Sequence, residues 1–446
     1  STPTTWSSPS RSPGSSGPLR VGVGHVDLTA RLRDFFGPLG TKHLSLAGHG
    51  KRAFTRGNSG PADPLFAKAI SIDNGRRRLL ILTADLLMLN RRLAEGTLEE
   101  LARRGLSFRR DEVLFSATHT HSAYAGYTDR WVEVPSVGFH RPDVSRVLIH
   151  ALADACEAST RKRQQAEIAF ATADLSQEQL VVNRIDKNST TNDLLDVMIL
   201  RDSSTHRLIA SLTIFSPHAT CRPRRDESVS ADYPGAVCRH VEAETGVPCL
   251  FLAGAVGSMG PADLGPPREN WIELMGARIG SHVVELINAR KSASSKVDIA
   301  CAAVTLTLPS AEIKLGEGYR LSPILSRFLL PGETTLHGVR LGRHLFLSMP
   351  ADFSGELAKE IRTSTSGLTT IVTSFGGDYV GYIIPKKYAD LPTYEAQSAS
   401  ILGPDADTFF TSAARRLVEH LTPADPREYP VPSGDTNPYT LRISAN

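Results

Sequence analysis

The stretch LFSATHTHSAYAGY, residues 114–127, joins an apolar run to two histidines that stand one residue apart. The apolar run is typical of a buried strand, and we expect this strand to span 111–121. Side chains alternate between the two faces of a strand, so His119 and His121 would then point the same way. Two imidazoles directed at one place can be metal ligands, an acid–base pair or a polar rim.

The segments on both sides of this stretch alternate between strand-like and helical patterns. Apolar runs bounded by turn residues predict strands, and apolar residues at helical spacing predict helices. We expect strands over 77–85, 111–121, 207–218 and from 247, helices over 91–105, 143–159 and 230–246, a strand, loop and helix over 343–364, and a strand and loop over 369–385. This alternation predicts the α/β class.

The composition is that of a globular protein, with 41% apolar and 22% charged residues among 446. The formal net charge of +3, from 50 basic and 47 acidic residues, is too small to indicate nucleic-acid binding. No apolar run approaches the roughly 18 residues of a membrane-spanning helix. The five cysteines are scattered without a Cys-x-x-Cys pair, which argues against a cysteine zinc finger and leaves one disulfide open.

The two ends of the chain differ in composition from the rest. Residues 1–18 are rich in Ser, Thr, Pro and Gly and are predicted to be a flexible leader. Residues 19–424 are predicted to form one catalytic domain, and residues 425–446 an extended tail. Because the chain starts at Ser1, either a signal peptide or anchor was removed or the sequence was trimmed. The first explanation predicts an extracytoplasmic protein that is secreted, periplasmic or anchored to a membrane.

Polar residues recur where the predicted strands end. They are Asp85, His119, His121, His218, Asp352 and Tyr382. The loops after strands are where α/β proteins place their sites. Two neutral imidazoles and one carboxylate are a common ligand set for catalytic zinc, with a further position left for water. Each residue also has a structural alternative, as a hydrogen-bonded histidine, a helix-capping aspartate or a half-buried tyrosine, and the residues alone leave both open.

The same segments resemble a known enzyme family. SATHTHSAYAGY is similar to the THTHSGPxGY segment of the neutral (non-lysosomal) ceramidases, and other segments follow in that family's order. They are VGVGHVDLT (21–29), LLILTADLLML (79–89), Asn183-Arg184, FSPHATC (215–221), VSADYPG (229–235), LSMPADFSGELAKEIR (347–362), and DYVGYIIPKKY with YEAQSASILGP from residue 378. The resemblance covers most of the chain.

Ceramidases of this family are zinc-dependent amidases that cut ceramide into a fatty acid and a sphingoid base. The resemblance implies mixed β-sheets flanked by helices, one Zn²⁺ per chain, and a lipid or other N-acyl small molecule as substrate. It also implies four zinc ligands, which are His119, His218, Asp352 and Tyr382. His121 would lie in the pocket beside the metal, while Arg184 and Asp232 would line the pocket.

Two departures from the family bear on the chemistry. The family's carboxylate ligand is usually Glu, and Asp352 is one methylene shorter, so its backbone must lie closer to the metal. The serine regarded as catalytic in ceramidases falls on Gly260, whereas Ser258 stands where the family has Asp. We keep both positions as candidate pocket residues. The missing serine favours direct attack by a water that zinc activates, with Tyr382 stabilising the oxyanion and either His121 or a carboxylate moving the proton to the leaving amine.

Two further departures concern the surroundings of the site. The family's HGTS segment reads HATC at residues 218–221, followed by three arginines within residues 222–225. Arg222 and Arg224 are candidate contacts for an acidic headgroup, because Arg binds phosphate or carboxylate in a fork. The alternative is a solvated loop whose charges meet Asp226 and Glu227. Ceramidases also carry a C-terminal β-sandwich domain, and we expect this chain to hold the catalytic domain only.

The leading hypothesis is therefore a zinc-dependent amidohydrolase acting on ceramide or a related N-acyl lipid. A zinc-dependent esterase or lactonase on another acyl compound is an alternative, because the serine loop is changed. A non-catalytic lipid-binding relative is a third, although such a protein has no need for the ligand set. Peripheral contact with a membrane is expected to be weak for a chain of net charge +3, and the sequence does not indicate an oligomeric state.

Overall fold

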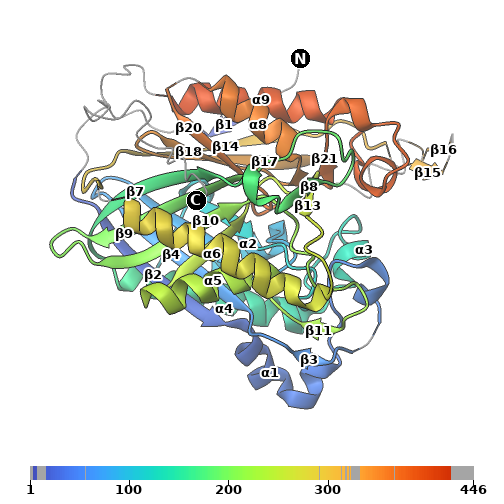
Figure 1. Ribbon diagram of the computed structural model, residues 1–446, viewed down its shortest axis with the longest axis horizontal. Helices are drawn as coiled ribbons and strands as arrows, with labels where there is room; N and C mark the ends of the chain where they lie inside the picture. Colours follow the sequence, from blue (N-terminus) through green and yellow to red (C-terminus); the bar gives the residue numbers. More distant parts are fainter. Residues whose placement is uncertain are drawn as a thin grey trace.

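The computed structural model describes residues 4–7, 17–55, 57–290, 292–312, 314–316, 319–320, 322, 332–365 and 367–422. Two sheets lie face to face, and helices cover the outer face of each, so that the molecule has four layers (Figure 1). This is the α/β class with mixed sheets flanked by helices, as predicted. The predicted tail, residues 425–446, lies outside the described residues.

The larger sheet has eight strands in the order β12-β10-β9-β7-β2-β4-β5-β6. Most neighbours are antiparallel, but the outer pairs β10–β12 and β5–β6 are parallel, so the sheet is mixed. The strands are β2 (Arg20–Asp27), β4 (Phe66–Asp73), β5 (Arg78–Ala84), β6 (Val113–Ala117), β7 (Gln164–Asp174), β9 (Leu194–Asp202), β10 (Leu208–Phe215) and β12 (Cys249–Ala253).

The smaller sheet has five strands in the order β1-β14-β17-β18-β20. They are β1 (Thr4–Ser7), β14 (Ile299–Thr307), β17 (Glu333–Leu341), β18 (His344–Ser348) and β20 (Thr369–Thr373). Thr4–Ser7 belongs to the predicted flexible leader, but it pairs antiparallel with β14, so this part of the leader has regular structure. The rest of the leader up to residue 16 lies outside the described residues.

Short ladders of two or three residues tie the loops together near one end of the sheets. They are β3 (Gly60–Pro61) with β11 (Ser228–Val229), β8 (Val181–Asn183) with β13 (Met259–Pro261), β15 (Lys314–Gly316) with β16 (Tyr319–Arg320), and β19 (Asp352–Phe353) with β21 (Tyr382–Ile383). The last pair is parallel and sets Asp352 directly opposite Tyr382.

The helices pack on the sheets through apolar faces. The larger sheet is covered by α1 (Leu28–Lys42), α2 (Arg91–Arg103), α4 (Pro142–Arg161), α5 (Asp232–Thr245) and α6 (Trp271–Ala289), with the short α3 (Val134–Val137) beside them, and the smaller sheet by α8 (Gly355–Ser364) and α9 (Ala406–Leu421) (Figure 1). Capping follows local rules: the Asn90 side chain accepts from the Leu93 amide, and Gly246 ends α5 with a left-handed backbone.

A buried apolar layer joins the two sheets. Val21, Ile81 and Leu250 from the larger sheet pack with Val339 and Phe346 from the smaller one, all essentially without exposed surface. Each apolar side chain buried in this way contributes about 1.5–3 kcal/mol relative to exposure. The strands therefore hold the loops at their ends in fixed positions.

The larger sheet curls so far that its two edge strands approach each other. β12 at one edge packs against β5 and β6 at the other, and the Thr83 hydroxyl donates to the Phe251 carbonyl at 2.8 Å. A strong twist of neighbouring strands accumulates into this shape. The loops that follow β6 and β10 are consequently close in space although the strands are far apart in the sheet order.

Most predicted elements match the observed ones within a few residues, including β5, α2, α4, β10 and α5. One boundary matters. β6 ends at Ala117, so His119 and His121 lie beyond the strand, and the expected strand over 111–121 is too long. His119 has φ +61°, in the left-handed region, and the alternation rule of a strand does not apply to it.

Candidate active site

The four residues predicted to bind zinc meet at one point. His119 follows β6, His218 follows β10, Asp352 lies in β19 after β18, and Tyr382 lies in β21 after β20. All four are buried, with at most 6% of their surface exposed. The sheet curl brings the two histidines together, and the β19–β21 ladder adds the other two.

Backbone carbonyls fix the proton on both histidines. His119 Nδ1 lies 2.7 Å from the Leu87 carbonyl oxygen, and His218 Nδ1 lies 2.9 Å from the carbonyl oxygens of Val256 and Met259. A carbonyl only accepts, so each Nδ1 carries the proton and donates it. In the neutral imidazoles each Nε2 therefore presents a lone pair to the interior of the site.

The Asp352 carboxylate faces these two lone pairs. Its Oδ1 lies 3.2 Å from His119 Nε2 and 3.4 Å from His218 Nε2, yet it has no hydrogen-bond donor in the described part of the chain. Its Oδ2 accepts a hydrogen bond from the Tyr379 hydroxyl at 2.7 Å. His119 Nε2 and His218 Nε2 can accept from His121 Nε2 and from the Tyr382 hydroxyl, but Asp352 Oδ1 has no donor among the described residues. The approach of this carboxylate oxygen to two imidazole lone pairs is repulsive unless a cation lies at the centre.

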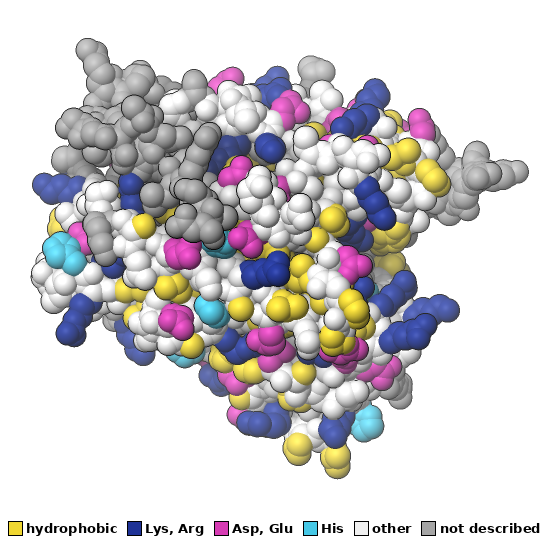
Figure 2. All heavy atoms as spheres, viewed as in Figure 1, with side chains coloured by type: hydrophobic (Ala, Val, Ile, Leu, Met, Phe, Trp, Pro, Cys, Tyr) yellow, Lys and Arg dark blue, Asp and Glu magenta, His cyan; other side chains and the backbone are white. Residues whose placement is uncertain are grey.

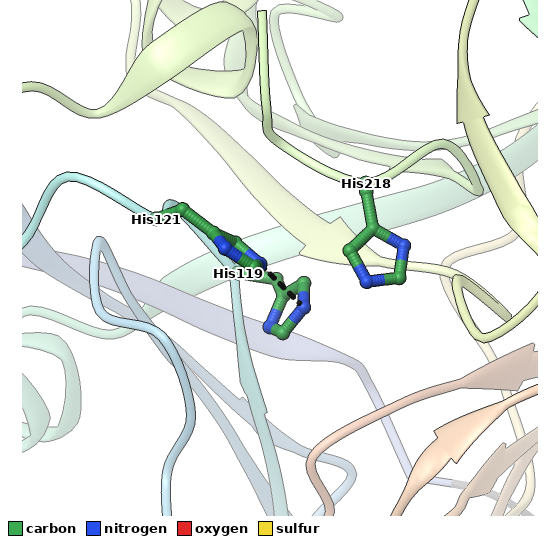
Figure 3. A group of neighbouring side chains, drawn as sticks. All are labelled: His119, His121 and His218. Atoms are coloured by element: carbon green, nitrogen blue, oxygen red, sulfur yellow. Dashed lines mark hydrogen bonds between the residues drawn. The ribbon is translucent and has the colours of Figure 1, made fainter. Parts of the chain in front are cut away.

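This donor set fits a zinc ion. Two imidazole nitrogens and a carboxylate oxygen are a typical set for catalytic zinc, and carbonyl groups on the far nitrogens are the usual outer contacts. Burial lowers the pKa of His218 well below 6.5, so a second proton on that ring is an unfavourable substitute for the cation. His119, His121 and His218 also have ring nitrogens within 4.8 Å of one another, and their rings gather around one point (Figure 3).

His121 lies at the edge of this set. Its Nε2 is 3.2 Å from His119 Nε2, and its buried Nδ1 has no hydrogen-bond partner among the described residues. Arg52 donates to its backbone carbonyl at 2.8 Å, and the ring of His49 lies 4.9 Å away. Gly48 makes room for the His121 ring, because a Cβ there would lie 2.6 Å from Cγ of His121. Burial, and then the nearby histidines, lower the pKa of His121 well below 6.5.

Tyr382 completes the cluster as a hydrogen-bond donor. Its hydroxyl lies 2.9 Å from His218 Nε2, and the two rings are nearly parallel. Burial raises the pKa of this hydroxyl well above 10, so the protein alone keeps it protonated. A protonated phenol donates a hydrogen bond to a developing oxyanion, which suits it to that role as much as to metal binding.

The position of the family's serine is filled from the side by an arginine. Gly260 lies in β13, and a Cβ there would come within 2.7 Å of Cγ of Arg184. The Arg184 guanidinium is 3.0 Å from the buried carboxylate of Glu395, which holds it over the glycine. Ser258, two residues earlier, is fully buried and shares a hydrogen bond with Ser354 at 2.8 Å. Its hydroxyl is therefore held by another side chain.

Asp232 and Arg222, two predicted pocket residues, have their charged groups bound within the loop that follows His218. The Asp232 carboxylate accepts from three backbone amides, those of Cys221, Arg222 and Tyr233, and so it shapes the loop after His218. The Arg222 side chain is paired with Asp226, as in the solvated-loop alternative. Arg224 is exposed and has no ion pair within the described ranges.

A sequence profile of the neutral/alkaline non-lysosomal ceramidases, N-terminal part, matches residues 20–250, slightly more than half of the chain. The chain belongs to this family. The matched part contains His119, His121 and His218, and it ends before Asp352 and Tyr382. The resemblance seen in the sequence is therefore confirmed, and the family is one of hydrolases.

Solved ceramidases share the fold. The neutral ceramidase from Pseudomonas aeruginosa superposes with a TM-score of 0.77 at 16% identity, covering 96% of this chain and 76% of that one. A second structure, described as a ceramidase complexed with C2, has a TM-score of 0.75 at 16% identity, covering 92% of this chain and 77% of that one. At this identity the likeness concerns the fold.

Three groups that support the site were not predicted from the sequence. Tyr379 bonds Asp352, Phe375 stacks on His119 with ring centroids 4.2 Å apart, and the Leu87 carbonyl orients the same histidine. Phe375 has φ +63°, a rare conformation for an aromatic residue. Tyr379 stands three residues before Tyr382 in the quoted segment DYVGY, but nothing in the sequence distinguishes a ligand from its support. A backbone carbonyl has no sequence signal at all.

Proposed function

We propose that this chain is a zinc-dependent ceramidase that cleaves the N-acyl amide bond of ceramide or a related N-acyl lipid. The observation that carries the proposal is the convergence of His119 Nε2, His218 Nε2 and Asp352 Oδ1, in which the buried carboxylate oxygen faces two imidazole nitrogens and has no hydrogen-bond donor among the described residues. Family membership supplies the reaction class. One zinc ion per chain would lie at this point, with Tyr382 at its edge.

Zinc, when bound, supplies a Lewis acid and lowers the pKa of a coordinated water to about 7. The protein residues do the rest. His119, His218 and Asp352 hold the ion, and the Tyr382 hydroxyl donates a hydrogen bond to the carbonyl oxygen of the substrate as negative charge develops on it. A fixed donor of this kind needs no reorganisation during the reaction.

His121 is the residue that moves the proton. It is neutral at pH 7 because its pKa is lowered, so it can accept a proton from the attacking water. The same low pKa makes the resulting imidazolium a strong acid, which passes the proton to the leaving amine. His49, beside it, is kept neutral because burial and nearby arginines lower its pKa to about 3.

Water, rather than a serine, is the proposed nucleophile. Gly260 has no hydroxyl, and Arg184 fills the space where a side chain would project. The Ser258 hydroxyl is buried against Ser354. The site therefore offers no free serine at either position, and the acyl group would pass to water in one displacement.

The test is fatty-acid release from a short-chain labelled ceramide by the purified protein, with chelated and zinc-restored samples in one run. We expect about one zinc per chain and release that is lost on chelation and regained with zinc. His119→Ala and His218→Ala should lose both zinc and activity. His150→Ala, on α4 and paired with Glu100, is the matched control and should lose neither. Full zinc and activity in either site variant would contradict the assignment.

Cleavage of a carboxylic ester at the same site is a second candidate. The glycine at position 260 favours it, because the site lacks the family's serine and an alkoxide leaves with less help from a proton than an amine does. The discriminating measurement compares an amide and an ester that share one acyl chain. Zinc-dependent cleavage of the ester alone would move the function to this class, whereas cleavage of neither compound by zinc-loaded protein would favour a non-catalytic relative.

A further inference from the structure

Four large apolar side chains project into solvent from two neighbouring regions beside the site. Phe35 and Leu39 are 49% and 74% exposed on α1, and Phe54 and Phe139 are 47% and 62% exposed after η1 (Gly50–Ala53) and α3. We call this set the apolar rim. Exposed apolar groups that gather in one region of a surface mark sites of interaction, whereas single ones do not.

The two parts of the rim are linked through Arg141, and the part that holds Phe54 adjoins the active site. The rings of Phe54 and Phe139 contact each other edge to face at 5.4 Å, and the Arg141 guanidinium, two residues after Phe139, lies over the ring of Phe36 on α1. Phe54 follows η1, whose first residue comes directly after His49, and His49 packs on His121. The segment from α1 to His49 also pairs with the chain after His121, through the Leu46–Tyr124 bridge.

The sequence FFGPLG, residues 35–40, gives this end of α1 its shape. Gly37 has φ +74° and breaks the helix, and Pro38 follows it. Phe36 packs against the core, while Phe35 and Leu39 on either side of the break project outward. Hydrophobic side chains form the outermost tip of the molecule at the position of α1 (Figures 1 and 2). A convex apolar tip of this kind costs solvation energy unless it is covered.

Basic side chains surround the rim. The exposed ones without an ion pair, as far as the structure describes the chain, are Arg33, Lys42, Lys51, Arg146, Arg224 and Arg225, and Arg146 lies over the ring of Phe35. The exposed acids among them are Asp34 and Glu227, so the region is net positive. Arg52 ties the basic loop to the active site, because it donates to the backbone carbonyls of Asp226 in the loop and of His121 at the site. Positive charge around an apolar tip complements an anionic surface whose interior is apolar.

We propose that the apolar rim docks on a lipid bilayer that contains anionic headgroups, so that an N-acyl lipid passes from the bilayer to the site. The inference rests on the proposed function for its substrate. Phe35, Leu39, Phe54 and Phe139 enter the boundary between headgroups and acyl chains, and the basic side chains lie at the headgroups. In the described residues no helix has the length and hydropathy to cross a bilayer.

The experiment measures flotation of the full chain with vesicles of phosphatidylcholine alone and with added phosphatidylglycerol. Two double variants remove the rim in halves, Phe35→Ser with Leu39→Ser, and Phe54→Ser with Phe139→Ser. Leu274→Ser is the matched control, because Leu274 is 40% exposed on α6, outside the rim. We expect each double variant to bind anionic vesicles at least about tenfold more weakly, and the control to bind as the original chain does.

Activity is measured in parallel on two substrates, a soluble short-chain ceramide and a long-chain ceramide held in the vesicles. We expect the double variants to lose vesicle-borne turnover and to keep turnover of the soluble substrate. Equal vesicle binding by the original chain and both double variants would overturn the docking proposal. If the double variants lose vesicle binding but the original chain cleaves no ceramide, the docking proposal is supported and the proposed function is contradicted.

Discussion

The Nε2 atom of His119 lies 3.2 Å from Oδ1 of Asp352, although in the neutral imidazole neither atom has a proton to share. The other side of each group is already occupied, by the Leu87 carbonyl and by the Tyr379 hydroxyl. The metal-free site therefore holds a carboxylate oxygen against the lone pairs of neutral imidazoles, and this repulsion is relieved when a cation binds.

Asp352→Asn should stabilise the metal-free protein while it abolishes zinc binding. The amide nitrogen can donate to the His119 and His218 lone pairs, and the amide oxygen can still accept from Tyr379. We expect a gain of about 1 kcal/mol in the free energy of unfolding, measured by denaturant titration in chelator. Asp352→Ala is the control and should lose zinc without this gain. A less stable Asn variant would show that the three groups do not repel one another.

Tyr379→Phe and Tyr382→Phe should separate metal support from catalysis. Loss of the Tyr379 hydroxyl leaves Asp352 Oδ2 without its donor, so zinc affinity should fall about 10- to 100-fold. Loss of the Tyr382 hydroxyl should lower kcat by about 100- to 1,000-fold with zinc retained. Zinc affinity is measured by competition with a chromophoric chelator. The roles are wrong if Tyr382→Phe is the variant that loses zinc.

Gly260→Ser should lower activity rather than restore a serine nucleophile. The new Cβ would come within 2.7 Å of Cγ of Arg184, and Glu395 restrains that side chain. We expect a higher KM, because the displaced guanidinium intrudes on the pocket. Arg184→Ala removes the side chain with which the new serine collides. In that background, adding Gly260→Ser should therefore lower activity less than it does in the original chain. A gain in amide cleavage by the single variant would show that the serine had been limiting.

Arg224→Ala should affect only substrates that carry a negative headgroup. Its exposed guanidinium belongs to the loop that Arg52 fixes beside His121, and its charge, with those of three other arginines, lowers the pKa of His49. Loss of this charge should lower kcat/KM for an anionic N-acyl compound by about 5- to 10-fold at low salt. The adjacent exposed Arg225→Ala is the matched control. Equal losses in both variants would indicate a general effect of net charge.

Glu133 should make the stability of the fold depend on pH. Burial raises its pKa to about 7, although Asn90 and Thr128 donate to its Oε2. A raised folded-state pKa means that the stabilisation is complete below the unfolded value near 4.5 and is lost as pH rises through about 7. Between about pH 5 and pH 8 this group should cost on the order of 3 kcal/mol. Glu133→Gln should flatten the profile, whereas exposed Glu333→Gln should not.

Local patterns in the sequence were sufficient for the elements and for the family. The helical spacing of 143–159 predicts α4, the glycine at 246 predicts the end of α5, and the apolar run before His218 predicts β10. These signals work because the period of apolar residues and the conformational preference of glycine depend on neighbouring residues only. The ordered segments around His119, His218, Asp352 and Tyr382 also named the candidate ligands.

Where the strands stop, the sequence was less informative. His119 and His121 converge, but not because they share a strand face, since β6 ends at Ala117 and His119 has a left-handed backbone. Asp352 is no helix cap either, because the Ser354 side chain caps α8. These conformations depend on contacts with distant segments, such as the Leu87 carbonyl and the Gly381 carbonyl that accepts from the Asp352 amide.

The sequence by itself thus determined the class of fold, the family and the residue types available for a metal site. Only the tertiary structure decided that Oδ1 of Asp352 lacks a donor, that Tyr379 supports it, and that Arg184 fills the space at Gly260. The physical reason is distance along the chain. The curl of the larger sheet joins segments more than a hundred residues apart, the β19–β21 ladder joins two separate strands, and no local pattern records such contacts.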